Sequence, residues 1–468
     1  MGKSFGLTCA AMLLLSGCVS APPTTPQVAQ TTDSSLGLGP APAPRFDQAW
    51  WKAFNDPQAD RLVAQALDKN PSLQSALARI RAAQAELSTA RALDYPQVSL
   101  DAQEQRELLS NRYGLLPPLG GSWQWVGDAQ AHLNWSLDFW GKQAALIDKA
   151  RSTAEAASLD AAAARLALAG MFAQTYIALS LAYQNLDIAK LTVTERQTIL
   201  DLTQSRVTSG LENEASLEQA RALLALAKIE VRRAETARDL AVHAIAALVG
   251  EGAAAYPAIT RPAATLETAL PLPDALPADL LSRRPDVLAA RARISAAMRG
   301  RDAAHADFYP NINLVAAIGF QAIGLSSLLS ADALTMGVGP ALHLPIFDAG
   351  RLRAQYARAT ADLDSAVADY NGAVVTAVRQ TADALTQVAS LSDQRLEQQK
   401  ALDSASRALK LAEERYRLGL SGQIPMLTAE STLLTARQQM AALMAEAMAQ
   451  RVTLLLSLGG GFDPEKAS

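Results

Sequence analysis

Two stretches of this chain decide its fold, because they are copies of one pattern. Arg206 to Gly250 reads RVTSGLENEASLEQARALLALAKIEVRRAETARDLAVHAIAALVG, and Tyr416 to Gly459 reads YRLGLSGQIPMLTAESTLLTARQQMAALMAEAMAQRVTLLLSLG. Each copy has a Gly-Leu pair that interrupts a long helical pattern, and each ends on a glycine 40 residues later (250 − 210 and 459 − 419). This repeated spacing predicts a duplicated helix–turn–helix.

The duplication extends upstream of both stretches. Pro71 to Tyr95-Pro96 matches Pro285 to Tyr309-Pro310, and Phe139-Trp140-Gly141-Lys142 corresponds to Phe347-Asp348-Ala349-Gly350-Arg351. The offset between the copies is 214 residues early and 209 later, which one short deletion explains. We therefore predict two copies of one unit, each a helix, a strand, a loop, a strand, a long helix, a turn and a second helix.

The composition excludes some partners. A formal net charge of −4 and a pI near 5.7 give no reason to expect nucleic acid or an anionic membrane surface as a partner. Aromatic residues are only 5 % and alanine is very common, which suits long, closely packed helices. After the N-terminus no run of 18 uncharged apolar residues occurs, so we expect no transmembrane helix.

The N-terminus has the pattern of a targeting segment. Lys3 and the apolar run Phe5 to Leu15 predict a signal peptide over 1–17, and Leu15-Ser16-Gly17-Cys18 is similar to a bacterial lipobox. Cys18 is therefore the expected lipidation site; the alternative is an ordinary signal with an incidental cysteine. By the same resemblance, Ser20 favours the outer membrane over the inner one. Residues 18–45 are expected to be a lipidated, disordered tether.

Strict alternation predicts strands at 95–109 and 123–138, with copies at 309–322 and 335–347. In the second of these strands Gln124, Asp128, Gln130, His132, Asn134, Ser136 and Asp138 share one parity, whereas Trp125, Ala129, Leu133, Trp135 and Leu137 share the other. A soluble sandwich would give the same alternation. Four strands are too few for such a sandwich, however, and tryptophans near strand ends suit a membrane interface. Because a barrel in lipid must close, oligomerisation is expected.

Proline spacing predicts the helices. No proline occurs between Pro118 and Pro257 or between Pro345 and Pro425, which allows long helices there. Helical hairpins are therefore expected over 142–250 and 350–459, with tips at 206–213 and 415–422. Helices of this length need lateral packing. The two repeats would then cover 46–255 and 256–461, with a disordered tail at 462–468.

A search for catalytic or metal-binding patterns identified none. The four histidines, His132, His243, His305 and His343, lack metal-ligand spacing. Met440, Met444 and Met448 could form a copper stripe, but this spacing is more typical of core packing. Gly459-Gly460-Gly461 has no following Lys-Ser/Thr, so it is interpreted as a helix end rather than a phosphate loop. We therefore expect no enzyme activity, no metal and no cofactor beyond the covalent lipid on Cys18.

Taken together, these pieces resemble the TolC-like outer-membrane efflux channels, in particular their lipoprotein branch. The resemblance covers Ala49 to Gly461 and depends on Trp51 with Asp56-Pro57, the two Tyr-Pro strand entries, Leu344-Pro345-Ile346-Phe347-Asp348-Ala349-Gly350-Arg351 and Arg415-Tyr416-Arg417-Leu418-Gly419. It implies a mixed α/β membrane protein: a homotrimer with a 12-stranded outer-membrane β-barrel that continues into a 12-helix periplasmic α-barrel. It also implies a passive exit channel for drugs or other toxic small molecules, joined by a periplasmic adaptor to an inner-membrane transporter.

The resemblance also implies site residues. The barrel lumen would be lined by Asp101, Asp128, Gln130, His132, Asn134 and Asp138, and the adaptor would dock on Arg206, Gly210, Leu211, Arg415, Gly419 and Leu420. The periplasmic aperture maps to Ile424, Leu427, Thr428 and Ser431, where the Asp/Arg pair of many relatives is missing. We expect closure by apolar packing of Ile424 and Leu427 with hydroxyl contacts; the alternative is Glu430 with an arginine of a neighbouring helix.

Two further points follow from the resemblance. The loops 115–123 and 323–329 look more like those of channels that pair with major-facilitator pumps than with resistance-nodulation-division pumps. The competing interpretation of the whole chain is a structural, periplasm-spanning coiled-coil lipoprotein without channel activity. That alternative explains the helices and Cys18 but leaves the alternating, tryptophan-bearing strands unexplained.

Overall fold

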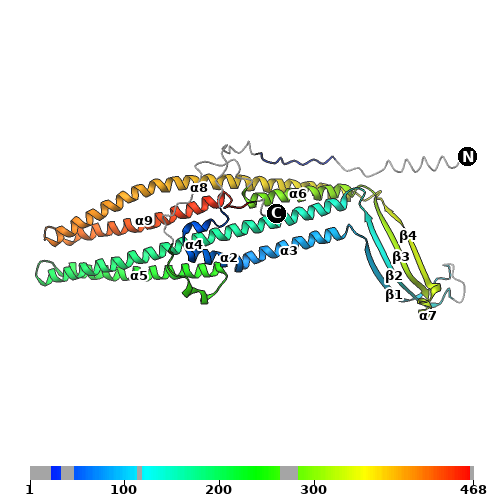
Figure 1. Ribbon diagram of the computed structural model, residues 1–468, viewed down its shortest axis with the longest axis horizontal. Helices are drawn as coiled ribbons and strands as arrows, with labels where there is room; N and C mark the ends of the chain where they lie inside the picture. The colour runs from blue at the N-terminus through cyan, green and yellow to red at the C-terminus, as the bar shows by residue number, and fades with distance from the viewer. Residues whose placement is uncertain (1–22, 33–46, 113–118, 264–282, 464–468) are drawn as a thin grey trace. The chain divides into compact units, whose positions relative to one another are not determined.

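The structure is a computed structural model that describes residues 23–32, 47–112, 119–263 and 283–463, and it is mostly helical with one small sheet (Figure 1). The signal peptide, Cys18, most of the predicted tether, residues 115–118 of the first loop and nearly all of the predicted tail lie outside these residues. The chain divides into two compact units, one from 1–30, 80–157 and 290–370, the other from 31–79, 158–289 and 371–468. Each unit draws on both sequence repeats, so the repeats are not the compact units.

The elements follow the predicted order in both repeats. The first repeat contains η2 (Trp50–Phe54), α2 (Pro57–Lys69), α3 (Pro71–Ala92), β1 (Gln97–Leu108), β2 (Trp123–Leu137), α4 (Lys142–Thr208) and α5 (Glu214–Val249). The second contains η3 (Ala253–Ala258), α6 (Pro285–Ala306), β3 (Asn311–Ile323), α7 (Leu325–Leu328), η5 (Ala331–Ala333), β4 (Leu334–His343), α8 (Arg351–Arg417) and α9 (Gln423–Ser457). Strand β4 ends at His343, four residues before the predicted 347.

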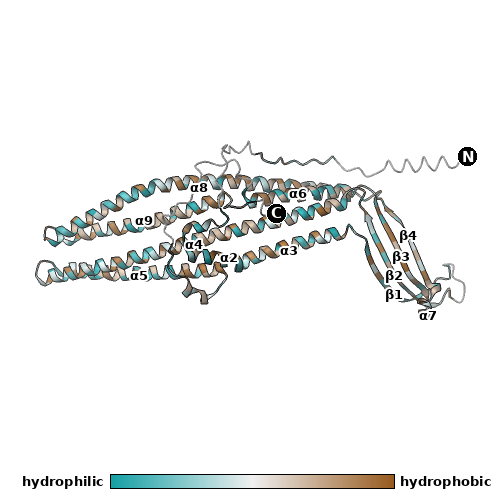
Figure 2. Ribbon diagram, viewed as in Figure 1, coloured by the Kyte–Doolittle hydropathy of each residue, from teal (hydrophilic) through white to brown (hydrophobic). Residues whose placement is uncertain are grey.

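The sheet belongs to the first unit and joins the two repeats. Its order is β1-β2-β3-β4, and all three neighbouring pairs are antiparallel. Within it, β2 pairs with β3 from Val126↔Ile323 to Leu137↔Ile312, although one strand comes from each repeat. Figure 2 shows hydrophobic residues along all four strands.

Helices α4 and α8 are uninterrupted over 67 residues each, about 100 Å at the usual rise per residue. Neither Gly170 nor Gly372 breaks them. At Gly170 an added Cβ would lie 2.3 Å from Leu456 Cδ1, so this glycine allows α9 to pack closely on α4. Both helices are followed by a short turn and a returning helix of about half their length (Figure 1).

In the second unit, the returning helices end against the shorter helices at two equivalent joints. At the first joint, α5 meets α3: Asn70 caps α3 by accepting from Ser72 N at 2.9 Å, and its Nδ2 donates to Leu248 O at 2.9 Å. At the second, α9 meets α6, and Arg284 Nη1 donates to Ser457 O at 3.2 Å. Both side chains supply donors to carbonyls that a helix end leaves without partners.

The core of the second unit lies around η2 and α2. Trp50, Trp51 and Phe54 pack with buried residues of α4, α5 and α9. The Tyr176 hydroxyl donates to Asp56 Oδ2 at 2.6 Å, and Asp56 also caps α2 by accepting from Gln58 N at 2.9 Å. Trp51 and Asp56, two residues of the motif identified in the sequence, therefore hold the short helices η2 and α2 against the longer ones.

Among the described residues, α4 is the one helix long and apolar enough to cross a membrane by length and composition. The prediction counted only unbroken apolar runs, and the uncharged polar residues Gln174, Thr175 and Ser180 interrupt the apolar stretch of α4. Half of this stretch is buried inside the protein, and its buried residues include Phe172 and Tyr176 of the core. Packing in the core of the second unit accounts for its apolar character.

The first joint predicts a sharp effect of one methyl group. Gly250 has φ of +77°, and an added Cβ would lie 2.8 Å from Lys69 O. We expect Gly250→Ala to destabilise the fold by about 2–4 kcal/mol, because backbone strain and a clash with main-chain atoms add. Gly210→Ala is the matched control, since Gly210 has φ of +68° but open space around its Cβ position. Thermal unfolding in detergent measures the difference, and equal losses of Tm would contradict the joint's role.

Candidate functional site

The predicted lumen residues of β1 and β2 lie on one face of the sheet. Asp101 pairs with Gln130, and Gln103 with Asp128, so their side chains share a face. His132 and Asn134 follow on the same parity, and His132 Nε2 lies 4.0 Å from Asp101 Oδ2. On β3 and β4 this face continues with small residues such as Ala317, Gly319, Gly337 and Gly339.

Asp138 has a structural role that the sequence prediction missed. It lies just after β2, and its two carboxylate oxygens accept from the backbone N–H groups of Gln143 at 2.9 Å and Ala144 at 2.8 Å. The side chain therefore caps the first turn of α4, where a negative charge is favoured. In the second repeat, Asp348 accepts in the same way from Gly350 and Leu352, and these hydrogen bonds lower its pKa. The two aspartates fix the strand-to-helix transitions.

The opposite face of the sheet is apolar across all four strands. Cross-strand pairing places on it Val98, Leu100, Trp125, Leu133, Trp135, Leu137, Ile312, Leu314, Ile318, Phe320, Met336, Val338 and Leu342. Many of these side chains are exposed: Leu100 by 75 %, Met336 by 70 % and Val338 by 76 %. The charged exceptions are Glu104 and Arg106, near the loop end of β1. A continuous exposed apolar face of this size needs a partner surface or lipid.

The two helical tips close in the same way. Leu211 N donates to Arg206 O at 2.9 Å, and Leu420 N donates to Arg415 O at 2.8 Å. The glycine before each leucine is left-handed, with φ of +68° at Gly210 and +73° at Gly419. This is the helix-ending motif in which glycine tolerates a conformation that other residues resist. Both leucines remain exposed, by 67 % and 68 %.

Arg206 differs from the other predicted docking residues because it is engaged inside the chain. Its guanidinium lies 4.7 Å from the centre of the Tyr416 ring, and its Nη1 donates to Tyr416 O at 3.3 Å. Tyr416 is fully buried, and the buried Gln423 donates to Thr203 at 3.0 Å. Arg206 therefore joins the end of α4 to the end of α8, whereas Gly210, Leu211, Arg415, Gly419 and Leu420 are exposed.

The structure divides the predicted aperture residues between two faces of α9. Ile424, Thr428 and Ser431 lie on one exposed face, and Ile424 is 69 % exposed. Leu427 is 7 % exposed and packs with Ile199, Leu409, Tyr416, Met426 and Leu433 inside the subunit. Leu427 lies about 60° around the helix from Ile424, toward the side that carries Gln423 and Glu430. Its part in closing the aperture stays a prediction.

The alternative partner, Glu430, lies on that buried face. Glu430 and Arg196 of α4 are 3 % and 8 % exposed in their side chains, and Arg196 Nε lies 2.9 Å from Glu430 Oε1. Beside them, Arg437 of α9 and Glu195 of α4 form a half-exposed pair at 3.0 Å. Two ion pairs thus connect α9 to α4 within one subunit. The sequence predicted an arginine partner for Glu430 but could not identify Arg196, which lies 234 residues away (430 − 196).

Burial controls the charge of Glu430. In the described part of the chain neither of its oxygens accepts a hydrogen bond, although Arg196 is close. Desolvation raises the pKa of Glu430 to about 7; attraction by Arg196 and Arg437 opposes this, and repulsion by Glu195 and by Glu413 of α8 adds to it. The carboxyl group therefore exchanges its proton near neutral pH.

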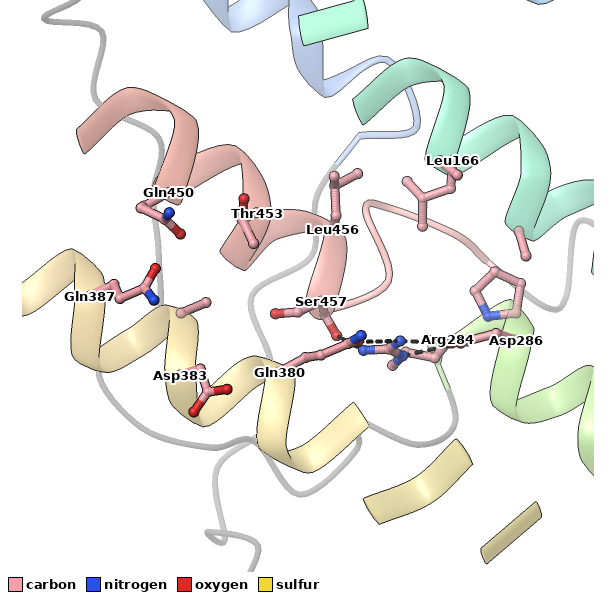
Figure 3. Close-up of a pocket in the computed structure, with 14 residues that line it drawn as sticks. Leu166, Arg284, Asp286, Gln380, Asp383, Gln387, Gln450, Thr453, Leu456 and Ser457 are labelled. Carbon is pink, nitrogen blue, oxygen red and sulfur yellow. Dashed lines mark hydrogen bonds and ion pairs between the residues drawn. The ribbon is translucent and has the colours of Figure 1, made fainter. Parts of the chain in front are cut away.

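A cavity of about 600 Å³ lies beside the second joint, between α4, α8, α9 and the start of α6 (Figure 3). Arg284 crosses its edge, with Asp286 at 2.7 Å and Gln380 at 2.9 Å from Nη2. Desolvation acts to raise the pKa of Asp286, but hydrogen bonding and attraction by Arg284 lower it below its usual value. The remaining wall combines amides, such as Gln387 and Gln450, with Leu166 and Leu456.

The described residues also contain no cluster of three or more histidine, cysteine or acidic side chains that could hold a metal ion. The methionines at 440 and 448 are buried, and Met448 belongs to the core of the second unit. His243 stacks on Tyr256 with ring centres 4.2 Å apart.

Comparison with known proteins agrees with this geometry. Residues 62–251 and 276–460 match the sequence model of the outer membrane efflux protein family. The fusaric acid resistance protein FusA of Burkholderia cepacia is 36 % identical over 361 residues, which cover 75 % of this chain and 68 % of FusA. Among solved structures, the outer membrane protein VceC of Vibrio cholerae superimposes with a TM-score of 0.83 at 32 % identity, covering 90 % of this chain and all of VceC.

A second solved structure, the outer-membrane channel OprN, has a TM-score of 0.82 at 28 % identity and covers 95 % of this chain and 99 % of its own. The chain therefore belongs to the outer membrane efflux protein family. It is an efflux channel of the outer membrane, a transport protein rather than an enzyme.

The pKa of Glu430 predicts how stability depends on pH. The folded-state pKa of about 7 is above the ordinary value of 4.5, so between these values the folded protein holds a proton that the unfolded chain has lost. This contribution to stability is complete below about pH 4.5 and is lost as pH rises to about 7, by a total on the order of 3 kcal/mol. We expect Glu430→Gln to remove this component of the pH dependence.

Thermal unfolding of the purified protein in detergent, measured from pH 4.5 to 8, tests this expectation. Glu195→Gln is the control, because it removes a carboxylate from the neighbouring, half-exposed pair. The control should keep most of the fall in Tm with rising pH. Equal pH slopes for wild type and Glu430→Gln would show that the buried carboxyl group does not titrate in this range.

Proposed function

We propose that this chain is the passive exit channel of a tripartite efflux pump and acts as a homotrimer. The observation that carries the proposal is the sheet, which has an apolar exposed face, a polar face and two outer strands, β1 and β4, with only one neighbour each. In lipid the unpaired backbone groups of such edges have to be satisfied. Three copies supply twelve strands, enough to close a barrel with the polar face inside.

The proposal extends to the helices. Each chain contributes two hairpins, α4–α5 and α8–α9, so three chains supply the twelve helices of a periplasmic tunnel. Lateral packing between chains stabilises helices of this length and gives the exposed apolar residues of α5, such as Leu226 and Leu240, a partner. Exposed aromatic residues at the strand roots, Phe139, Trp140 and Phe347, suit a membrane interface.

The partners follow from the tips and from the relatives. Leu211 and Leu420 present exposed apolar groups at the two tips, where a periplasmic adaptor would dock and join the channel to an inner-membrane transporter. The name of FusA links that protein to resistance against fusaric acid. By similarity, drugs or other toxic small molecules are the cargo here. The loops 115–123 and 323–329 favour a major-facilitator transporter over the resistance-nodulation-division type.

The outer-membrane anchor is proposed to be a lipid on Cys18, which would add acyl chains to the barrel. The competing proposal, a structural coiled-coil lipoprotein, is disfavoured by the sheet. A purely structural spacer has no use for four strands with an exposed apolar face. It also leaves the polar face of Asp101, Asp128 and Gln130 without a role.

The trimer is tested on purified protein and on outer-membrane fractions. We expect an SDS-resistant, heat-modifiable band at three times the chain mass, because closed barrels resist detergent until they are heated. Reconstitution into planar bilayers should then give discrete conductance steps. A water-soluble monomer without pore activity would contradict the proposal.

The aperture is tested with Ile424, whose exposed side chain lies one turn before Thr428 and about two turns before Ser431. We expect Ile424→Ala to raise the closed-state conductance in planar bilayers, because shortening the side chain on each of three subunits removes apolar contacts. Ile424→Leu is the control that keeps the apolar volume. If the alanine variant conducts like wild type, apolar packing at this position does not close the channel.

A further inference from the structure

Residues 23–32 belong to the segment that the sequence analysis expects to be a disordered tether, and the structure describes them. They form neither helix nor strand, but several of them are held by side chains of α6 and α8. We call residues 24–31 the strap. Most strap side chains are exposed, so its contacts are made mainly by the backbone.

The first contact is a carboxylate that accepts two consecutive backbone N–H groups. Asp364 Oδ1 lies 2.9 Å from Gln27 N and 3.1 Å from Val28 N. Hydrogen bonds to an ionised acceptor are stronger than those between neutral groups. Asp364 lies on α8, 336 residues from Val28 in the sequence.

The second contact comes from α6. Arg301 Nη2 donates to Thr24 O at 3.0 Å. The same guanidinium is positioned by buried groups of α8, because its Nε donates to Thr360 Oγ1 at 3.2 Å and it lies 5.0 Å from the centre of the Tyr356 ring. Arg301 is therefore held in place independently of the strap.

The third contact extends the pattern along α8. Asn371 Oδ1 accepts from Thr31 N at 2.8 Å. Asn371 is seven residues after Asp364, which is about 10 Å along a helix. From Val28 to Thr31 is three residues, also about 10 Å in an extended chain.

The strap sequence suits such binding. Thr24-Thr25-Pro26-Gln27-Val28 contains a proline, which restricts the backbone to extended conformations and reduces the entropy lost on docking. Pro26 has no N–H, and the two donors used by Asp364 follow it directly. Because the groove binds backbone groups, it needs no particular side chains from the strap.

We propose that Arg301 and Asp364 form a docking groove for this chain's own residues 24–28, and that the groove limits how far the N-terminus can extend. Cys18 precedes Thr24 by six residues, which span at most about 20 Å. Without the groove the free length would run from Cys18 to Trp50, the first residue of η2, and could span about 100 Å. The use of the groove in positioning a lipid depends on the proposed acylation of Cys18, but docking itself does not.

Hydrogen exchange of backbone amides in the full-length, acylated protein tests the docking. Gln27 and Val28 should be protected in wild type, and Asp364→Ala should accelerate their exchange roughly ten-fold or more. Asp362→Ala is the matched control, because it removes an exposed aspartate from the same turn of α8. Protection should remain in that variant.

A second arm separates the groove from the lipid. In a chain secreted with an ordinary cleavable signal and lacking Cys18, the strap amides should stay protected. Fast exchange in that chain, or unchanged exchange in Asp364→Ala, would overturn the proposal. Conductance in planar bilayers, measured in parallel, reports on the proposed channel function. Loss of strap protection with normal conductance, or the reverse, shows which of the two inferences has failed.

Discussion

The structure depends most on the backbone hydrogen bonds that the outer strands of the sheet leave unmade. Within the described residues, strands β1 and β4 each have a single neighbour, and one face of the sheet is apolar and exposed. In water such edges invite aggregation, and in lipid they are not tolerated. This constraint is the physical basis of the proposed homotrimer, in which copies of the chain would pair at both edges.

A second constraint acts where helices meet end to end. The duplicated sequence places α5 against α3 and α9 against α6, so the carbonyls of one helix face the N-terminus of the next. The two joints use different side chains at equivalent positions, Asn70 in the first repeat and Arg284 in the second. An amide and a guanidinium both donate hydrogen bonds, and the arginine adds a positive charge where the dipole of α9 is negative. The geometry was retained while the chemistry diverged.

Local pattern was enough to predict the elements. Alternation identified all four strands, and the spacing of prolines and glycines located both hairpins, because each of these signals is contained in a few consecutive residues. Tertiary contacts were beyond such signals. The strap was expected to be disordered because of its composition. Its hydrogen bonds to Asp364 could not be predicted, since Asp364 lies 336 residues from Val28. Arg206 was expected to be free for docking, but Tyr416 of the other repeat occupies it.

The aperture residues show how far sequence-based prediction reached within a single helix, α9. Ile424, Thr428 and Ser431 share an exposed face, because their spacing follows the helical period. Leu427 instead belongs to the buried series of α9 with Gln423, Met426, Glu430 and Leu433. The prediction grouped the four aperture residues by resemblance to a family, and this does not separate the two faces.

The pairing of β2 with β3 has a consequence for how the chain is made. These neighbouring strands are separated by the whole of α4, α5 and α6, so the central ladder of the sheet cannot form until most of the polypeptide has left the ribosome and crossed the inner membrane. Until then the β1–β2 hairpin has no third strand to pair with β2, and its apolar face is exposed. Long-range pairing of this kind is slow, and slow steps leave apolar surface open to wrong partners. A newly made chain therefore exposes apolar strand surface for as long as its central ladder is missing.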